Sequence, residues 1–139
     1  MIRKLGRLRL RGWYRLEDAR AMSEANSPGV YVLGHFKRLP KTVNPASRQV
    51  FYIGETCGQT LTKRWRQFNQ SAFRNRSAHS GGSTYYKQFG VRRQKDVAVA
   101  FYVPAHEKPL ATQVIRYVER LWLLEYCFRN RKPPTCNRK

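Results

Sequence analysis

Two short segments restrict the fold more than any other part of the sequence: GVYVLGHF (residues 29–36) and QVFYIG (residues 49–54). Both are rich in β-branched and aromatic residues, the composition typical of strands. The segment between them, KRLPKTVNPASR, is mostly polar and contains two prolines, so it is expected to form a loop. The sequence therefore predicts two strands joined as a hairpin with a long connection.

The rest of the chain mixes helical and strand-like patterns. TLTKRWRQFNQSAF (residues 60–73) begins with Thr60, a suitable N-cap, and places Leu61, Trp65 and Phe68 on one helical face. The other predicted elements are a helix over 16–26, a loop over 75–82, a short helix over 83–89 ended by Gly90, a strand over 96–103 and a long helix over 110–129. This order predicts a small α/β fold, of the layered α+β kind, with one three-stranded sheet.

A strong positive charge is the main feature of the composition. The chain has 28 Lys and Arg against 8 Asp and Glu, a formal net charge of +20. Self-repulsion at this level opposes compaction, and the usual compensation is a polyanionic partner, most often nucleic acid. A length of 139 residues fits one globular domain, with a basic arm and helix over residues 1–27 before the main body over residues 28–139. The alternating RLRLR of the arm predicts either an added edge strand or a segment along a phosphate backbone.

Membrane binding is the competing interpretation of a basic chain. We find no apolar run long enough to span a bilayer and no signal-peptide pattern, so no membrane partner is expected. Cys57, Cys127 and Cys136 are widely spaced and form no C-x-x-C pair. This spacing argues against a disulfide framework or a cysteine zinc site and favours a reducing, cytoplasmic setting.

Tyrosine and glycine recur together on the two predicted hairpin strands. Tyr31 ends GVY, Tyr52 begins YIG, and Arg64 follows on the next helix. A phosphate held beside Gly54 would meet two phenol hydroxyls and a guanidinium, the components of a phosphodiester-binding site. Core or cross-strand packing is the alternative role for each tyrosine taken alone.

Taken together, GVY, YIG and the helical LTKRW resemble the GIY-YIG nuclease family over roughly residues 28 to 137. The resemblance implies a small three-stranded antiparallel sheet flanked by helices. It also implies hydrolysis of DNA phosphodiesters with one divalent metal ion per site, Mg²⁺ or Mn²⁺. Under that scheme Tyr31 acts as general base toward the attacking water and Tyr52 hydrogen-bonds the phosphate or the water. Arg64 would neutralise charge on the phosphoryl oxygens.

The other site residues implied by the resemblance are less regular. Many relatives carry a His or Tyr one turn after the arginine, where this chain has Phe68, and His79 is the expected substitute. For the metal-binding glutamate we favour Glu119, within VERLWL, and keep Glu125 as the alternative. Asn137 corresponds to the family's final asparagine, which orients active-site groups.

The remaining expectations concern binding. As exposed cations around the arginine helix, Lys63, Arg66, Arg74 and Arg76 are predicted to contact DNA phosphates without reading sequence. The expected substrate is double-stranded or branched DNA, and a homodimer is one arrangement that could supply specificity. A module with the same fold that binds nucleic acid without cutting, or one directed to RNA, is the alternative function.

Overall fold

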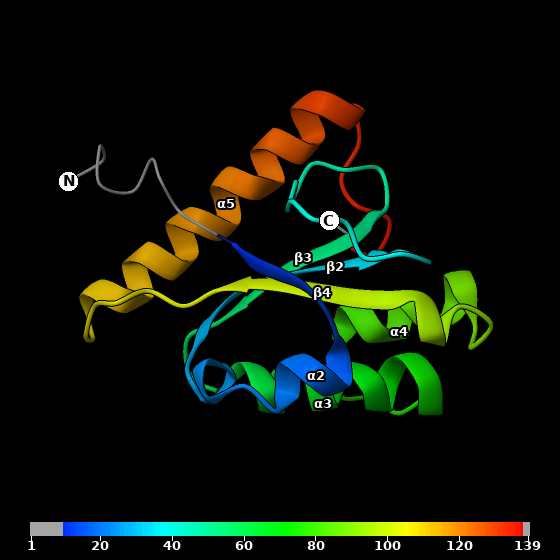
Figure 1. The fold of residues 1–139 in the computed structure, drawn as a ribbon, viewed down its shortest axis with the longest axis horizontal. Coiled ribbons are helices and arrows are strands. Elements are labelled where there is room, and N and C mark those ends of the chain that lie inside the picture. Colours follow the sequence, from blue (N-terminus) through cyan, green and yellow to red (C-terminus); the bar gives the residue numbers. More distant parts are fainter. Residues whose placement is uncertain (1–9, 138–139) are drawn as a thin grey trace.

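The computed structural model of this chain describes residues 10–137, which fold around one antiparallel sheet (Figure 1). The sheet has four strands in the order β1-β4-β2-β3: β1 (Arg11–Arg15), β2 (Gly29–His35), β3 (Val50–Thr56) and β4 (Val97–Tyr102). The sequence predicted β2, β3 and β4, and their hairpin pairing of β2 with β3 is confirmed. The expectation of a three-stranded sheet was wrong, since β1 adds a fourth strand.

The extra strand comes from the basic N-terminal segment. Arg11 lies opposite Phe101 and Arg15 opposite Ala98 along the edge of β4. RGWYR lacks the apolar alternation that marks a strand. It is an edge strand that pairs on one side only, and its Gly12 lies directly against Ala100 of β4. The edge-strand alternative is therefore correct from residue 11 onward, while residues 7–9 of RLRLR lie outside the described part of the chain.

Helices cover both faces of the sheet. Helix α5 (Leu110–Asn130) crosses one face, while α2 (Leu16–Arg20), α3 (Leu61–Arg74) and α4 (Ser80–Phe89) lie against the other (Figure 1). Thr60 caps α3 as predicted, because its side chain accepts a hydrogen bond from the Lys63 N–H. No helix within residues 10–137 is both long and apolar enough to cross a membrane.

Two predicted boundaries were wrong. The helix expected over 16–26 ends at Arg20, and a 3₁₀ helix (Ser23–Asn26) follows after Met22 takes up extended backbone. The predicted 75–82 loop is shorter than expected, since α4 already begins at Ser80. Its helical Gly82 lets α4 approach α3 closely: a Cβ there would lie 2.7 Å from the Ser71 Cβ.

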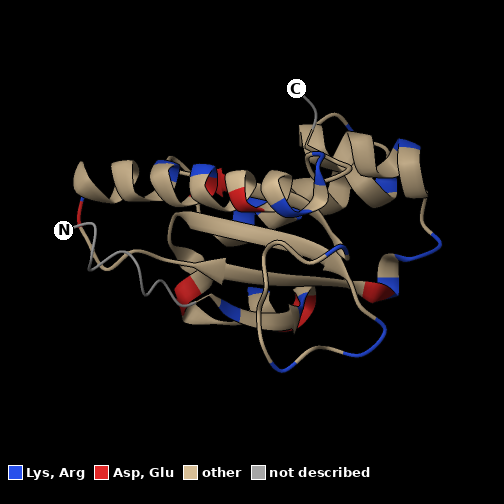
Figure 2. Ribbon diagram, turned by 90° about the horizontal axis from the view of Figure 1, so that it is seen from above, with Lys and Arg blue, Asp and Glu red and all other residues tan. Residues whose placement is uncertain are grey.

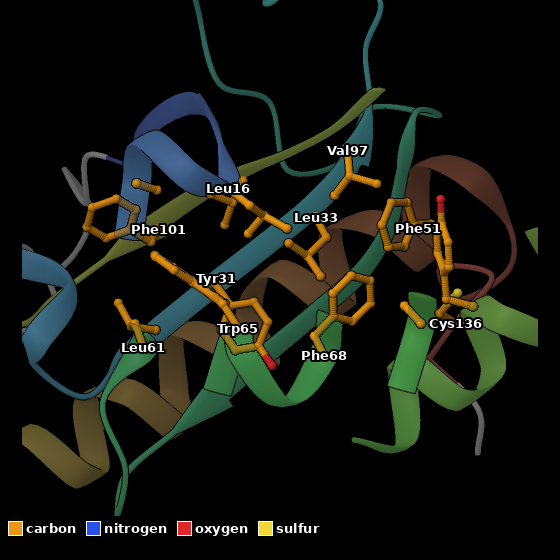
Figure 3. Close-up of a cluster of buried hydrophobic side chains, with 14 of the residues drawn as sticks. Leu16, Tyr31, Leu33, Phe51, Leu61, Trp65, Phe68, Val97, Phe101 and Cys136 are labelled. Atoms are coloured by element: carbon orange, nitrogen blue, oxygen red, sulfur yellow. The ribbon is translucent and has the colours of Figure 1, made fainter. Parts of the chain in front are cut away.

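Alternating side chains of the strands build one core on each face. On the face of α2 and α3, Tyr31 and Leu33 of β2 pack with Phe51, Trp65 and Phe101 (Figure 3). On the α5 face, the intervening residues of β2 pack against the buried stripe of that helix, and the members of this cluster include Val30, Val32, Ile53, Val114, Val118 and Trp122. Tyr31 is thus fixed in the central strand by packing as well as by hydrogen bonds.

The C-terminal segment covers the free edge of β3. The Cys136 N–H donates to the Phe51 carbonyl at 2.8 Å. The Asn137 side chain then accepts from the Ile53 N–H and donates to the Ile53 carbonyl, both at 2.8 Å. These three bonds replace the ladder that a fifth strand would make, directly beside Tyr52.

Removal of the Asn137 amide should expose this edge. We expect Asn137→Ala to lower the free energy of unfolding by roughly 1–2 kcal/mol, because two hydrogen bonds to Ile53 are lost. Urea denaturation followed by circular dichroism measures the change. Lys132→Ala, an exposed change in the same segment, should stay within about 0.5 kcal/mol of the wild type. Equal stability of Asn137→Ala and wild type would contradict the edge-covering role.

Candidate active site

Tyr31 and Tyr52 meet on one face of the sheet. In the β2–β3 ladder Tyr31 lies opposite Gly54 and Leu33 opposite Tyr52, so both phenols project to the same side. Their ring centroids are 5.9 Å apart. A Cβ on Gly54 would lie 2.4 Å from Cε1 of Tyr52 and 3.0 Å from the Tyr31 hydroxyl, so the glycine of YIG is what allows the two rings to approach.

A second glycine confines Tyr52 from the other side. A Cβ on Gly81, in the first turn of α4, would lie 2.5 Å from Cε2 of Tyr52. The ring of Tyr52 is therefore held between backbone of β3 and backbone of α4, and it cannot move away from one glycine without contacting the other.

This confinement makes Gly54 sensitive to the smallest substitution. We expect Gly54→Ala to lower the free energy of unfolding by about 1–3 kcal/mol, because the added methyl overpacks Tyr52 against Gly81. Gly58→Ala is the matched control: its Cβ would meet nothing within 4 Å, so its stability should stay within about 0.5 kcal/mol of the wild type. Urea denaturation of both variants tests this, and equal effects would refute the tight approach.

His79 joins the start of α4 to Tyr31. As N-cap of α4, its Nδ1 accepts a hydrogen bond from the Gly82 N–H at 3.0 Å, and its Nε2 lies 2.7 Å from the Tyr31 hydroxyl. A backbone N–H can only donate, so Nδ1 carries no proton and the proton of the neutral ring is on Nε2. His79 therefore donates to the Tyr31 oxygen and leaves the Tyr31 proton directed elsewhere.

Burial controls the protonation of this group of side chains. Burial and, second, the charge of Arg64 lower the pKa of His79 to about 3, which keeps it neutral. Burial raises the pKa of Tyr31 well above 10, an effect that Tyr52 adds to and Arg64 opposes. Burial also raises the pKa of Tyr52, whereas Arg64 and hydrogen bonding with Tyr31 lower it. Of the two phenols, Tyr52 is the less buried, since Tyr31 has no exposed surface.

Acid should destabilise the protein through its two buried histidines. His35, hydrogen-bonded to the Tyr85 hydroxyl at 2.8 Å, has a pKa lowered by burial to about 4. The unfolded chain binds protons near pH 6.5 and the folded one does not, so stability is full above that pH and falls below it. Between pH 7 and pH 5 we expect a loss of roughly 2 kcal/mol for each histidine, measured by denaturant titration.

A substitution of His79 separates its share of this loss. His79→Asn keeps an N-cap side chain for α4 but removes the titrating ring, so the acid loss should fall by about half. His106→Asn changes an exposed histidine and should leave the loss unchanged. An unaltered pH dependence in His79→Asn would contradict the buried, neutral state of this ring.

Phe68, one helical turn after Arg64, lies wholly in the core. It has no exposed surface, and its ring packs 5.6 Å from that of His79. The structure thus brings His79, not the residue one turn after Arg64, to Tyr31. The signal for this in the sequence is the segment His79-Ser80-Gly81-Gly82, whose two glycines let α4 approach β3 and α3.

Arg64 and Glu119 reach the tyrosines from opposite layers. Arg64 is half-buried on α3 and donates to the Gln67 side-chain oxygen at 2.6 Å, and its charge opposes the rise in pKa of both tyrosines. Glu119 is half-buried on α5, and its charge raises the pKa of both. Side chains from α3, from α5 and from the N-cap of α4 therefore influence the same pair of phenols.

A groove of about 370 Å³ opens beside this group. Its lining includes Tyr52, Ser80, Glu119 and Asn137, so it runs between the edge of β3, the start of α4 and helix α5. Tyr31 lies behind Tyr52 and has no exposed surface. The Asn137 amide is engaged with Ile53, so Asn137 holds the backbone next to Tyr52. Glu125, the alternative to Glu119, is exposed and does not line the groove.

Two carboxylates on this side could hold a cation. Burial raises the pKa of Glu119, and the charge of Glu55 raises it further. Glu55 lies opposite Val30 in the ladder, so it projects to the α5 face, and the sequence analysis missed it although it directly follows YIG. Neither carboxylate forms an ion pair with a described cation. Among residues 10–137, no cluster of three or more His, Cys, Asp or Glu could hold a metal ion.

This donor set fits a particular kind of ion. A half-buried carboxylate with a second carboxylate nearby carries negative charge that a divalent cation would offset. Mg²⁺ binds in this way, through one or two carboxylates while keeping several waters and adding substrate oxygens. The residues present therefore suit Mg²⁺ or Mn²⁺, which keeps part of its water shell, better than an ion that takes all of its ligands from the protein.

The four cations predicted to contact DNA are all exposed. Lys63, Arg66 and Arg74 lie on α3, and Arg76 lies just after it. Lys and Arg positions occur on both helical layers and in the loops, with few acidic positions between them (Figure 2). Within residues 10–137 only two ion pairs form, Arg11–Glu24 and Arg93–Asp96, so most described cations lack an acidic partner.

Comparison with known proteins adds no assignment. No protein-family model, no curated protein and no solved structure matches this chain.

Proposed function

We propose that this protein is a metal-dependent DNA endonuclease of the GIY-YIG type, which hydrolyses phosphodiester bonds. The observation that carries the proposal is the grouping of Tyr31, Arg64 and Glu119 around Tyr52: each of the three shifts the pKa of Tyr52, and Tyr52 and Glu119 both line the groove. Such side chains match the needs of phosphoryl chemistry, in which charge must be stabilised on the transferred group and on the leaving oxygen.

Arg64 is proposed to bind the scissile phosphate. A guanidinium offers a fork of donors that fits two phosphoryl oxygens at once, and hydrogen bonds to charged groups are stronger than neutral ones. The single bond to Gln67 holds the Arg64 side chain in place and leaves other N–H groups for the phosphate.

The tyrosines are proposed to share the handling of the attacking water. Tyr52 lines the groove and would contact the water. Tyr31 lies behind Tyr52 and interacts with the Tyr52 hydroxyl. The donor order from Gly82 to His79 to Tyr31 is fixed by the backbone N–H, so Tyr31 can direct its own proton toward Tyr52 and favour the ionised form of Tyr52. We therefore propose Tyr52 as the proton acceptor, and Tyr31, assigned that role from the sequence resemblance, as the group that supports it.

Glu119, with Glu55 beside it, would hold one Mg²⁺ or Mn²⁺. Such an ion, when bound, supplies Lewis acidity to the leaving 3′ oxygen of the phosphodiester. Lys63, Arg66, Arg74 and Arg76 are proposed to position the DNA through its phosphates.

Cleavage of supercoiled plasmid tests the proposal. Wild-type protein should nick the plasmid with Mg²⁺ or Mn²⁺ and not with EDTA. We expect Arg64→Ala and Glu119→Gln each to slow nicking at least about 100-fold, because each removes a charge that stabilises the transition state. Binding of DNA in EDTA, measured by fluorescence anisotropy, should change less than about threefold for Glu119→Gln, because the proposed phosphate contacts all remain in this variant. The two measurements therefore separate catalysis from binding.

Glu125→Gln is the matched substitution for the metal site, since it lies on the same helix but outside the groove. We expect it to retain nicking. Loss of activity in Glu125→Gln with retention in Glu119→Gln would move the metal to Glu125. A wild-type protein that binds DNA but cuts none with either metal would favour the non-cleaving binding module.

A further inference from the structure

A second and larger cleft lies away from the groove. It has a volume of about 570 Å³ and lies between the β1–α2 corner, the second half of α3 and the segment that leads into β4. The two cavities have no lining residue in common. None of the proposed catalytic side chains contacts this cleft, so its composition needs a separate explanation.

The rim of the cleft is strongly basic. Among the described residues that line it, the cations are Arg15, Arg20, Arg92 and Lys95, and the one acid is Glu17. None of these four cations forms an ion pair with a described acid. Arg15 is fixed in place by hydrogen bonds to the carbonyls of Asp96 at 3.0 Å and Lys37 at 3.1 Å, which leave other guanidinium N–H groups unengaged by those bonds.

The interior of the cleft combines apolar surface with an unsatisfied polar atom. Leu16, Phe73, Val91 and Val97 supply the apolar wall, and Val91 is exposed over 52% of its surface. The side-chain oxygen of Asn69 is buried without a hydrogen-bond partner in the described part of the chain. Asn69 also lines the cleft, so its side chain is the one neutral polar group on α3 that a ligand in the cleft would meet.

These features together match one unstacked nucleotide of a nucleic-acid strand. Phosphates suit the cationic rim, a base can pack against Phe73 and Val91, and the edge of the base would then face Asn69, which lines the same cleft. Arg66 precedes Asn69 by three residues and Phe73 by seven, so it lies on the same side of α3 and extends the basic surface from the cleft.

We propose that this cleft is a nucleic-acid exosite, which holds an unpaired nucleotide of the strand that the groove cuts. The inference rests on the proposed function in taking the strand to be that of a DNA substrate. It adds that the substrate carries a single-stranded or branched element, because a base inside an intact duplex cannot enter a cleft of this kind.

Binding in EDTA tests the exosite without any requirement for cleavage. The probes are a blunt fluorescein-labelled duplex and the same duplex with a single-stranded tail of about ten nucleotides. We expect Arg92→Ala/Lys95→Ala to weaken binding of the tailed duplex at least about tenfold, and of the blunt duplex less than about threefold. The salt dependence of binding to the tail should also decrease, because about two phosphate contacts are lost.

The chain offers a closely matched control. Arg129→Ala/Lys132→Ala removes the same two residue types at the same spacing from exposed positions at the end of α5, on the opposite face of the sheet. It should weaken binding of both probes less than about threefold. Equal losses in the two double variants would overturn the exosite, because net charge alone would then explain them. Failure of plasmid nicking with these binding differences intact would refute the nuclease and leave the exosite standing.

Asn69→Leu tests the interior of the cleft. The substitution removes the unsatisfied oxygen, so a purely structural Asn69 predicts unchanged or higher thermal stability and unchanged DNA binding. We expect the melting temperature to behave in that way while binding of the tailed duplex weakens at least about threefold. Unchanged binding of the tail would overturn the role of Asn69 and, with it, the nucleotide-binding interior.

Nuclear magnetic resonance identifies the ligand class directly. The side-chain amide resonance of Asn69, assigned by its loss in Asn69→Leu, should shift on addition of dAMP. Inorganic phosphate at the same concentration should not shift it. A shift with inorganic phosphate alone would indicate a simple anion site. No shift with either ligand would contradict a nucleotide site in this cleft.

Discussion

The hydrogen-bonded contact between His79 and Tyr31 connects the layers of this structure. The two ring nitrogens of His79 form hydrogen bonds to the first turn of α4 on one side and to Tyr31 of strand β2 on the other. Because Gly81 then lies against Tyr52, the same contact sets the position of the second phenol. The imidazole has to stay neutral to accept from Gly82, and burial ensures this. The arrangement of the groove therefore depends on a histidine that does not line it.

Sequence patterns predicted most of the fold, for identifiable reasons. Strands β2, β3 and β4 are apolar and β-branched, and α3 and α5 have a regular apolar stripe, so local composition and periodicity agree with the final packing. The fourth strand could not be predicted, because RGWYR becomes a strand only through pairing with β4. The early start of α4 was missed for a similar reason: Gly81 and Gly82 read as loop residues, and only close contact with Tyr52 and α3 shows why a helix needs them.

The candidate site divides in the same way. Tyr31, Tyr52, Arg64 and Glu119 could be chosen from motifs, since each motif fixes a residue type at a set place on an element. Their relative depth could not, because burial of Tyr31 behind Tyr52 depends on how α3 and α4 pack against the paired strands β2 and β3. Glu55 was missed because its side of the strand follows from the register with Val30. The cleft beside Asn69 has no motif, since its residues come from three distant segments.

The bonds from Asn137 to Ile53 have a consequence for folding. They join residues 84 positions apart in the sequence, whereas the β2–β3 hairpin forms between near neighbours. Long-range contacts require closure of large loops and tend to form after local ones. A chain in which the β2–β3 hairpin has already formed can thus still have an open β3 edge and an incomplete groove. Docking of this segment is then the step that completes the groove.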